Sequence, residues 1–227
     1  MNKRLQKIAG FVKPGRGLAD VGTDHCYLPL WLAEHGYEGE LFATDIVEKP
    51  LASAERTLRE AGMSGRIKLL LCDGLSLCPP ERIDSIVVAG LGGDTICGIL
   101  DRAEFCLDKA YTLILQPMTK AEVLRYWLVN NGFYLSREEL VLDGGTIYQV
   151  IEAKYGKKTS LTDAELFIGK WDNVKNDPLL PNYLSDCKKR FEKEIEGLLR
   201  AQSPAACRLA LCRGIADEIS KRQEEIG

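Results

Sequence analysis

Acidic residues follow short apolar runs at several points in the first half of the chain. Asp20, Asp45 and Asp73 each close such a run, and a glycine comes soon after the first and third of them. A carboxylate at the end of a strand can accept hydrogen bonds from ribose hydroxyls, and a glycine lets the backbone come close to a ligand. These residue types in this order favour a ligand that contains a nucleoside.

A glycine-rich segment, AGLGG at residues 89–93, follows the fourth apolar run. Such a loop leaves the backbone bare beneath a reacting centre. It lacks the lysine of the phosphate-binding G-x-x-x-x-G-K-[ST] motif, and residues 20–24 (DVGTD) do not form the G-x-G-x-x-G dinucleotide motif. Each of the four segments alone is compatible with an ordinary turn. Their occurrence after four successive apolar runs predicts a binding pocket.

The spacing of apolar residues predicts the elements that would position these segments. Strands are expected at 17–22, 41–45, 67–73, 83–90 and 111–117, and helices at 3–12, 27–35, 50–61, 94–100 and 120–131. Two further strands, 133–142 and 146–154, flank a Gly-Gly turn and predict a hairpin. Alternating strands and helices predict an α/β fold with a parallel, doubly wound sheet, in which ligands bind at the carboxyl ends of the strands. The near-continuous apolar strands are expected to be buried on both faces.

The last third of the chain has a different pattern. Helices are predicted at 162–174, 181–201 and 203–225, with breaks at Asp177-Pro178 and Ser203-Pro204, where Ser203 would cap the last helix. The two long amphipathic helices predict an antiparallel hairpin with coiled-coil-like packing. We therefore predict two domains, residues 1–156 and 157–227, with a hinge at 155–158.

The composition excludes several classes of protein. The chain has 227 residues, eight cysteines, two histidines and a net charge of −3, and no C-x-x-C spacing that would indicate a zinc site. No apolar run is long enough for a membrane span, and the N-terminus does not resemble a secretory signal. We expect a cytoplasmic protein with free thiols and no metal. The first 16 residues hold five basic residues and no acidic one, and this arm could contact a phosphate backbone.

The motifs together resemble the bacterial tRNA adenine-22 N1-methyltransferase family (TrmK). The most specific are D-H-x-Y-L-P at 24–29 and A-G-x-G-G at 89–93; the others are Arg4-Leu5, the carboxylates above, Leu115-Gln116-Pro117 and Tyr148. The resemblance implies a class I, Rossmann-like methyltransferase domain that binds S-adenosylmethionine. It also implies methyl transfer to N1 of adenine 22 in tRNA.

The resemblance assigns roles by position. The cofactor site would comprise Asp20, Gly22, Asp45, Ile46, Asp73, Gly74, Ala89, Gly90 and Gly92. The methylated base is cationic, so a nearby carboxylate would stabilise it, and Asp24 is the candidate. Tyr27 and Gln116 complete the predicted catalytic set by stacking or hydrogen bonding. The expected RNA contacts are Arg4, His25, Lys188, Lys189 and Arg190.

Structural roles remain open for several of these residues. His25 could satisfy backbone groups, Tyr27 could pack in a helix, and Gln116 could fix a loop. The basic run at 188–190 could be a solvated helix face. At the level of function, the alternatives are a methyltransferase of a small molecule or protein, a nicotinamide oxidoreductase on the same kind of sheet, and a nucleotide-binding module without activity.

Overall fold

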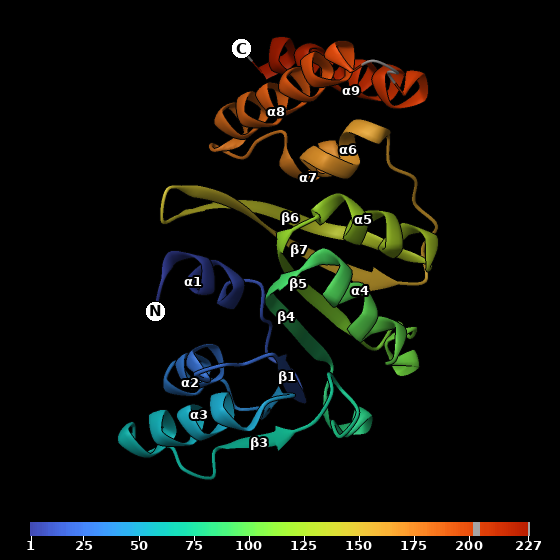
Figure 1. Cartoon of the computed structure of the whole chain (residues 1–227). Coiled ribbons are helices and arrows are strands. Elements are labelled where there is room, and N and C mark those ends of the chain that lie inside the picture. The colour runs from blue at the N-terminus through green and yellow to red at the C-terminus, as the bar shows by residue number, and fades with distance from the viewer. Residues whose placement is uncertain (202–204, 227) are drawn as a thin grey trace.

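The structure is a computed structural model of the chain, and it describes residues 1–201 and 205–226 (Figure 1). Its sheet has seven strands in the order β3-β2-β1-β4-β5-β7-β6. The strands are β1 (Gly17–Val21), β2 (Glu40–Asp45), β3 (Ile67–Leu71), β4 (Ser85–Gly92), β5 (Thr112–Thr119), β6 (Phe133–Asp143) and β7 (Thr146–Tyr155). The first five are parallel, and β7 runs antiparallel between β5 and β6. The predicted doubly wound sheet with a terminal hairpin is confirmed.

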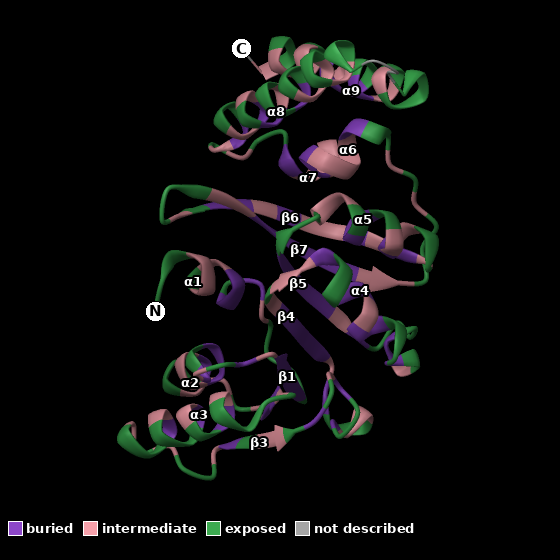
Figure 2. Cartoon of the chain, in the orientation of Figure 1, coloured by how far each residue is buried: buried purple, intermediate pink, exposed green. Residues whose placement is uncertain are grey.

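Helices cover both faces of this sheet and create two separate cores. On one face, α1 (Lys3–Ala9), α2 (Tyr27–Glu34) and α3 (Glu48–Glu60) pack against strand residues such as Leu18. On the other, α4 (Gly93–Asp101) and α5 (Ala121–Asn130) pack against Ala19 and its neighbours. Leu18 and Ala19 reach opposite cores because successive side chains of a strand point to opposite faces. Buried residues accordingly concentrate on the central strands (Figure 2).

Three predicted elements differ from the structure. The expectation that the near-continuous apolar strand at 67–73 is buried on both faces is wrong: Leu71 of β3 is 53% exposed, because β3 is the edge of the sheet. The first helix ends at Ala9 rather than at residue 12. The helix predicted over 162–174 is divided into α6 (Asp163–Ile168) and α7 (Trp171–Val174), because Gly169 adopts a φ of +97° between them.

The helical tail packs on the hairpin and on α5 (Figure 1). Its long helices, α8 (Leu180–Arg200) and α9 (Ala206–Ile226), contact each other along their apolar faces, and Arg208 Nε lies 2.6 Å from Glu194 Oε1. A third core joins these helices to α6, α7 and Leu140 of β6. The predicted helical hairpin is present; Ser203-Pro204 lies outside the described residues.

A buried polar network also connects the tail to the first part of the chain. The fully buried Arg125 guanidinium donates from Nε to Glu138 Oε1 at 2.8 Å, from Nη1 to the Leu166 carbonyl at 2.8 Å, and from Nη2 to Gln149 Oε1. Glu138 Oε2 accepts from the Lys170 backbone N–H at 2.7 Å. The network ties α5 and the β6–β7 hairpin to α6 and the segment after it. The division near residue 156 stays a prediction.

Other expectations concern cysteines and helices. All eight cysteines are free thiols, and only Cys207 is exposed. Among the described residues, no helix is long and apolar enough to cross a membrane, and no group of His, Cys, Asp and Glu side chains has the arrangement of a metal site. Two short 3₁₀ helices, η1 (Pro80–Arg82) and η2 (Glu104–Cys106), complete the fold.

Candidate functional site

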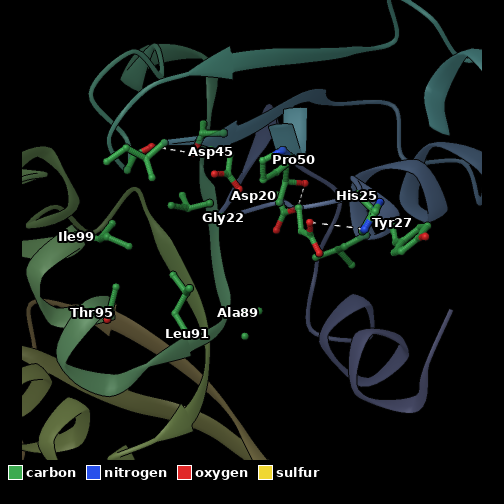
Figure 3. Close-up of a pocket in the computed structure, with 18 of the residues that line it drawn as sticks. Asp20, Gly22, His25, Tyr27, Asp45, Pro50, Ala89, Leu91, Thr95 and Ile99 are labelled. Atoms are coloured by element: carbon green, nitrogen blue, oxygen red, sulfur yellow. Dashed lines mark hydrogen bonds and ion pairs between the residues drawn. The ribbon is translucent and has the colours of Figure 1, made fainter. Parts of the chain in front are cut away.

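A cavity of about 760 Å³ opens at the carboxyl ends of β1, β2 and β4, where the strand order reverses (Figure 3). This is the position at which open α/β sheets bind ligands. The predicted site residues that line it are Arg4, Asp20, Gly22, Asp24, His25, Tyr27, Asp45, Ile46, Asp73, Gly74, Ala89 and Gly90. The structure therefore brings the acidic segments and the glycine loop to one cavity.

Asp20 is the most deeply buried carboxylate of the cavity. Asp20 is the second-last residue of β1 and is 6% exposed. Its Oδ2 accepts a hydrogen bond from Thr23 Oγ1 at 2.6 Å. Burial raises the pKa of Asp20 to about 6, because a charged carboxylate loses its hydration there, while the Thr23 hydroxyl acts in the opposite sense. Within residues 1–201 and 205–226 no basic side chain forms an ion pair with Asp20, and a buried carboxylate of this kind suits a cationic ligand group.

Asp45 is the last residue of β2, Ile46 follows it, and both line the cavity. Asp45 Oδ1 accepts from the Val47 backbone N–H at 2.9 Å, which orients the carboxylate. No partner for the other oxygen is found in the described part of the chain. Ile46 is 66% exposed, so an apolar side chain stands open at the cavity wall. The pair could hold a ribose and an adjoining flat base.

Replacing Asp45 with alanine is expected to weaken binding of an adenosyl ligand about 10-fold, since a charged hydrogen-bond acceptor is lost. The fold should remain intact, because the hydrogen bond found for the Asp45 side chain in the described residues is a local one, to the Val47 backbone N–H. Calorimetry with S-adenosylmethionine and a thermal melt would measure both effects. An unchanged affinity would show that Asp45 does not contact the ligand.

Asp73 and Gly74 lie in the loop after β3. Asp73 Oδ1 accepts from Arg102 Nη2 at 2.9 Å, and the Gly74 carbonyl accepts from Thr44 Oγ1 at 2.8 Å. Thr44 is fully buried, and its own carbonyl accepts from the backbone N–H groups of Gly22 and Thr23. It thus joins the loops after β1 and β3. In the sequence, Thr44 reads only as a β-branched strand residue.

Of the residues predicted to bind the cofactor or to act in catalysis, Gly92 and Gln116 lie outside the cavity lining. Gly92 is the N-cap of α4 and faces Thr119 of β5. Gln116 is fully buried, and its Oε1 accepts from the Gly90 backbone N–H at 3.1 Å. Gln116 therefore contacts the glycine loop but does not line the cavity itself.

His25 and Tyr27 lie at one end of the cavity and Thr95 and Ile99 at the other (Figure 3), and Asp24 also lines it. Asp24 and Cys26 have φ angles of +50° and +61°, a conformation that costs non-glycine residues energy and is found at functional sites. The Asp24 side chain is 70% exposed, with Oδ1 3.7 Å from His25 Nε2. The His25 and Tyr27 rings stack with centroids 5.3 Å apart and offer planar surfaces to a base.

The predicted RNA contacts fall into two places. Arg4 and His25 line the cavity, whereas Lys188, Lys189 and Arg190 lie on α8, outside it. Arg190 stacks over the Phe167 ring with its guanidinium carbon 5.2 Å from the centroid. No role in the site was predicted for the other lining residues, although some of them, such as Leu5, Thr23 and Leu91, lie within the motifs. These other residues are Asn2, Leu5, Val21, Thr23, Leu28, Thr44, Pro50, Leu91, Thr95, Ile99 and Arg102.

The sheet order and a carboxylate-lined cavity at its reversal point define a class I methyltransferase, and a model of the "Methyltransferase domain" family matches residues 1–151. The tRNA (adenine(22)-N(1))-methyltransferase of Bacillus subtilis is 32% identical over 163 residues, which cover 72% of this chain and 68% of that protein. The chain belongs to the bacterial tRNA (adenine-22-N1)-methyltransferase family.

Solved structures resemble the whole chain. The crystal structure of the Bacillus subtilis m1A22 tRNA methyltransferase TrmK has a TM-score of 0.83 and 25% identity, covering 100% of this chain and 99% of that one. The Mycoplasma capricolum TrmK structure, a complex with the cofactor product S-adenosylhomocysteine, has a TM-score of 0.82 and 25% identity, with the same coverage. The similarity therefore includes the helical tail.

Proposed function

We propose that this chain methylates N1 of adenine 22 in tRNA at the cavity described above. It is an S-adenosylmethionine-dependent tRNA (adenine-N1)-methyltransferase, in keeping with its family. We choose this cavity because Asp20, Asp45 and Asp73, which are far apart in the chain, all line it.

The residues present fit S-adenosylmethionine. The Asp20 carboxylate is buried, has a raised pKa and forms no ion pair in the part of the chain that the structure describes, so it suits the ammonium group of the methionine end. Asp45 lines the cavity, and its second carboxylate oxygen, which has no partner in the described chain, would accept from the ribose hydroxyls; the exposed Ile46 side chain offers an apolar surface to the adenine ring. Asp73 would accept from the adenine amino group, beside Gly74.

Catalysis would depend mainly on positioning. S-adenosylmethionine supplies an electrophilic methyl group when it is bound, and adenine N1 already carries an in-plane lone pair, so no strong base is required. Ala89 and Gly90 leave room for the base to approach in line, which can supply much of the rate enhancement. The exposed Asp24 carboxylate would stabilise the cationic product base.

The target base must leave its pairing partner before it can react. N1 lies on the Watson–Crick edge, and enzymes that modify such atoms extrude the nucleotide into a pocket. The stacked His25 and Tyr27 rings, with Tyr27 50% exposed, would receive the base at the mouth of the cavity. Stacking would compensate part of the cost of unstacking the RNA.

The RNA contacts proposed here form a local footprint. The basic N-terminal arm lies beside the cavity, and Lys188, Lys189 and Arg190 extend the positive charge along α8. We propose tRNA as the partner. This substrate also supports the expected cytoplasmic location. A local footprint agrees with an acidic chain that carries a net charge of −3.

The proposed function is tested by incubating the protein with radiolabelled S-adenosylmethionine and two tRNA transcripts, one with adenine and one with guanine at position 22. We expect label only in the first transcript, located on N1 of the adenine. Equal labelling of both would contradict the proposed specificity, and label in a protein or small molecule alone would favour another acceptor. Calorimetry that detected NAD but not S-adenosylmethionine binding would favour an oxidoreductase.

A further inference from the structure

Gln116 and Arg4 are distant in sequence and meet behind the glycine loop. Gln116 Oε1 accepts from Arg4 Nη1 at 2.5 Å and from the Gly90 backbone N–H at 3.1 Å, while Nε2 donates to the Pro117 carbonyl at 2.8 Å. Two donors point at one atom of the amide, so this atom must be the oxygen. The orientation of the buried side chain is therefore fixed by its neighbours.

The backbone of the glycine loop depends on this side chain. Ala89 pairs with Gln116 and Leu91 with Pro117, so Gly90 is left out of the ladder between β4 and β5. Gly90 has a φ of +81°, and its backbone N–H donates to Gln116 Oε1 in place of a ladder partner. The bulge brings Gly90 to the cavity wall. Gln116 thus shapes the surface on which the base would rest.

Arg4 brings a positive charge to the same place. Helix α1 is anchored by the buried Ile8, and the Asn2 side chain caps it by accepting from the Leu5 backbone N–H. Arg4 lines the cavity and has five N–H donors, of which one bonds to Gln116. In the described part of the chain, no carboxylate lies within salt-bridge distance of Arg4. The positive charge of Arg4 would repel a base that becomes cationic on methylation. It would attract a phosphate.

We propose that Gln116 is a positioning residue that holds the Arg4 guanidinium at the cavity rim, where Arg4 binds the phosphate of the nucleotide to be methylated. This inference rests on the proposed function and deepens it by naming what anchors the substrate. Because the same amide oxygen holds the Gly90 bulge, one side chain couples substrate binding to the geometry of methyl transfer.

The test is a double-mutant cycle on tRNA affinity with Arg4→Met, Gln116→Met and the double variant. Loss of the phosphate contact in R4M should weaken tRNA binding about 10-fold and reduce the slope of log Kd against log salt by about 1. Q116M should weaken binding about fivefold in the wild type and less than about twofold in R4M, because it acts through Arg4. Arg59→Met, on the exposed end of α3, removes the same charge elsewhere and should leave tRNA affinity unchanged.

Turnover separates a positioning role from a purely structural one. Q116M should lower kcat about 10-fold or more while the Kd for S-adenosylmethionine changes less than about threefold. Gln116→Glu keeps an acceptor oxygen for Arg4 and Gly90 but cannot donate to the Pro117 carbonyl, so it should recover part of the loss. An unchanged salt slope in R4M, or additive effects of R4M and Q116M, would overturn the inference. If Q116M does not fold, the salt slope of R4M and the turnover of Q116E still test the proposal. Failure of the wild type to methylate adenine 22 would instead contradict the proposed function.

Discussion

Asp20→Asn is expected to weaken S-adenosylmethionine binding strongly and, at the same time, to stabilise the ligand-free fold at neutral pH. The Asp20 carboxylate is buried, and the one hydrogen bond found for it in the described chain comes from Thr23 Oγ1. Loss of a charge-assisted contact to the ligand ammonium should raise the Kd roughly 10- to 100-fold. Without the ligand, the same charge is a cost, because it loses hydration and gains no cationic partner.

The pH dependence of both effects follows from the pKa of Asp20. Burial raises this pKa from 3.8 to about 6, so the folded state holds the proton more tightly than the unfolded state does. The cost of ionising Asp20 is therefore absent below the unfolded pKa, grows as the pH rises, and is complete above the folded pKa. D20N should raise the free energy of unfolding by about 1–3 kcal/mol at pH 8 and by little near pH 4.

Calorimetry and denaturant titrations at several pH values would check this prediction. Wild-type affinity for S-adenosylmethionine should fall as the pH drops through about 6, because protonated Asp20 cannot pair with the ammonium, whereas the affinity of D20N should lack this step. Asp24→Asn is a stability control, since the Asp24 side chain is 70% exposed and asparagine tolerates its positive φ. A D20N variant with reduced stability and unchanged affinity would contradict the assignment.

The residues that the sequence could locate share one geometric reason. Asp20, Asp45 and Asp73 each follow an apolar strand, and the carboxyl ends of parallel strands meet at one edge of a sheet. Correct strand assignment was therefore enough to bring them together. The alternation of strands and helices and the Gly-Gly turn likewise predicted the sheet and its hairpin, because these signals are local.

Contacts that depend on register between distant segments were not predictable in this way. Gln116 is buried and does not line the cavity, and its amide binds the Gly90 bulge of β4. Nothing in the segment Leu115-Gln116-Pro117 indicates which side of β5 the amide occupies. Thr44 joins the loops after β1 and β3 through hydrogen bonds, and these form only because the fold brings the two loops next to β2. The exposure of β3 follows from its place at the sheet edge, which hydropathy alone does not give.

The attachment of the tail is the other feature that local patterns missed. Arg125 appears in the sequence as one charged residue of a helical segment, yet its side chain is fully buried and binds groups from three other segments. A buried guanidinium requires a carboxylate and further acceptors, and Glu138, Gln149 and the Leu166 carbonyl supply them. The tail is thus joined to the rest of the chain by polar as well as apolar contacts.

Arg125→Met is expected to lower the free energy of unfolding by about 3–5 kcal/mol, because it leaves the Glu138 carboxylate buried without its cationic partner. The double variant R125M/E138L should recover part of this loss, since it removes the unpaired charge as well. Lys175→Met breaks the exposed pair with Asp172 and should cost no more than about 0.5 kcal/mol. Denaturant unfolding of the four proteins would measure these differences.

The same variants show whether the network does more than stabilise the fold. Arg125 lies outside the cavity proposed to bind S-adenosylmethionine, so folded R125M should bind this ligand with wild-type affinity. If the position of α6 and α8 matters for RNA, its affinity for tRNA should fall, because Arg125 holds the Leu166 carbonyl of α6 against α5. If R125M lost no more stability than K175M does, Glu138 would not be left unpaired by the substitution. If R125M lost affinity for S-adenosylmethionine and for tRNA to the same extent, the tail would support the whole fold rather than the RNA site.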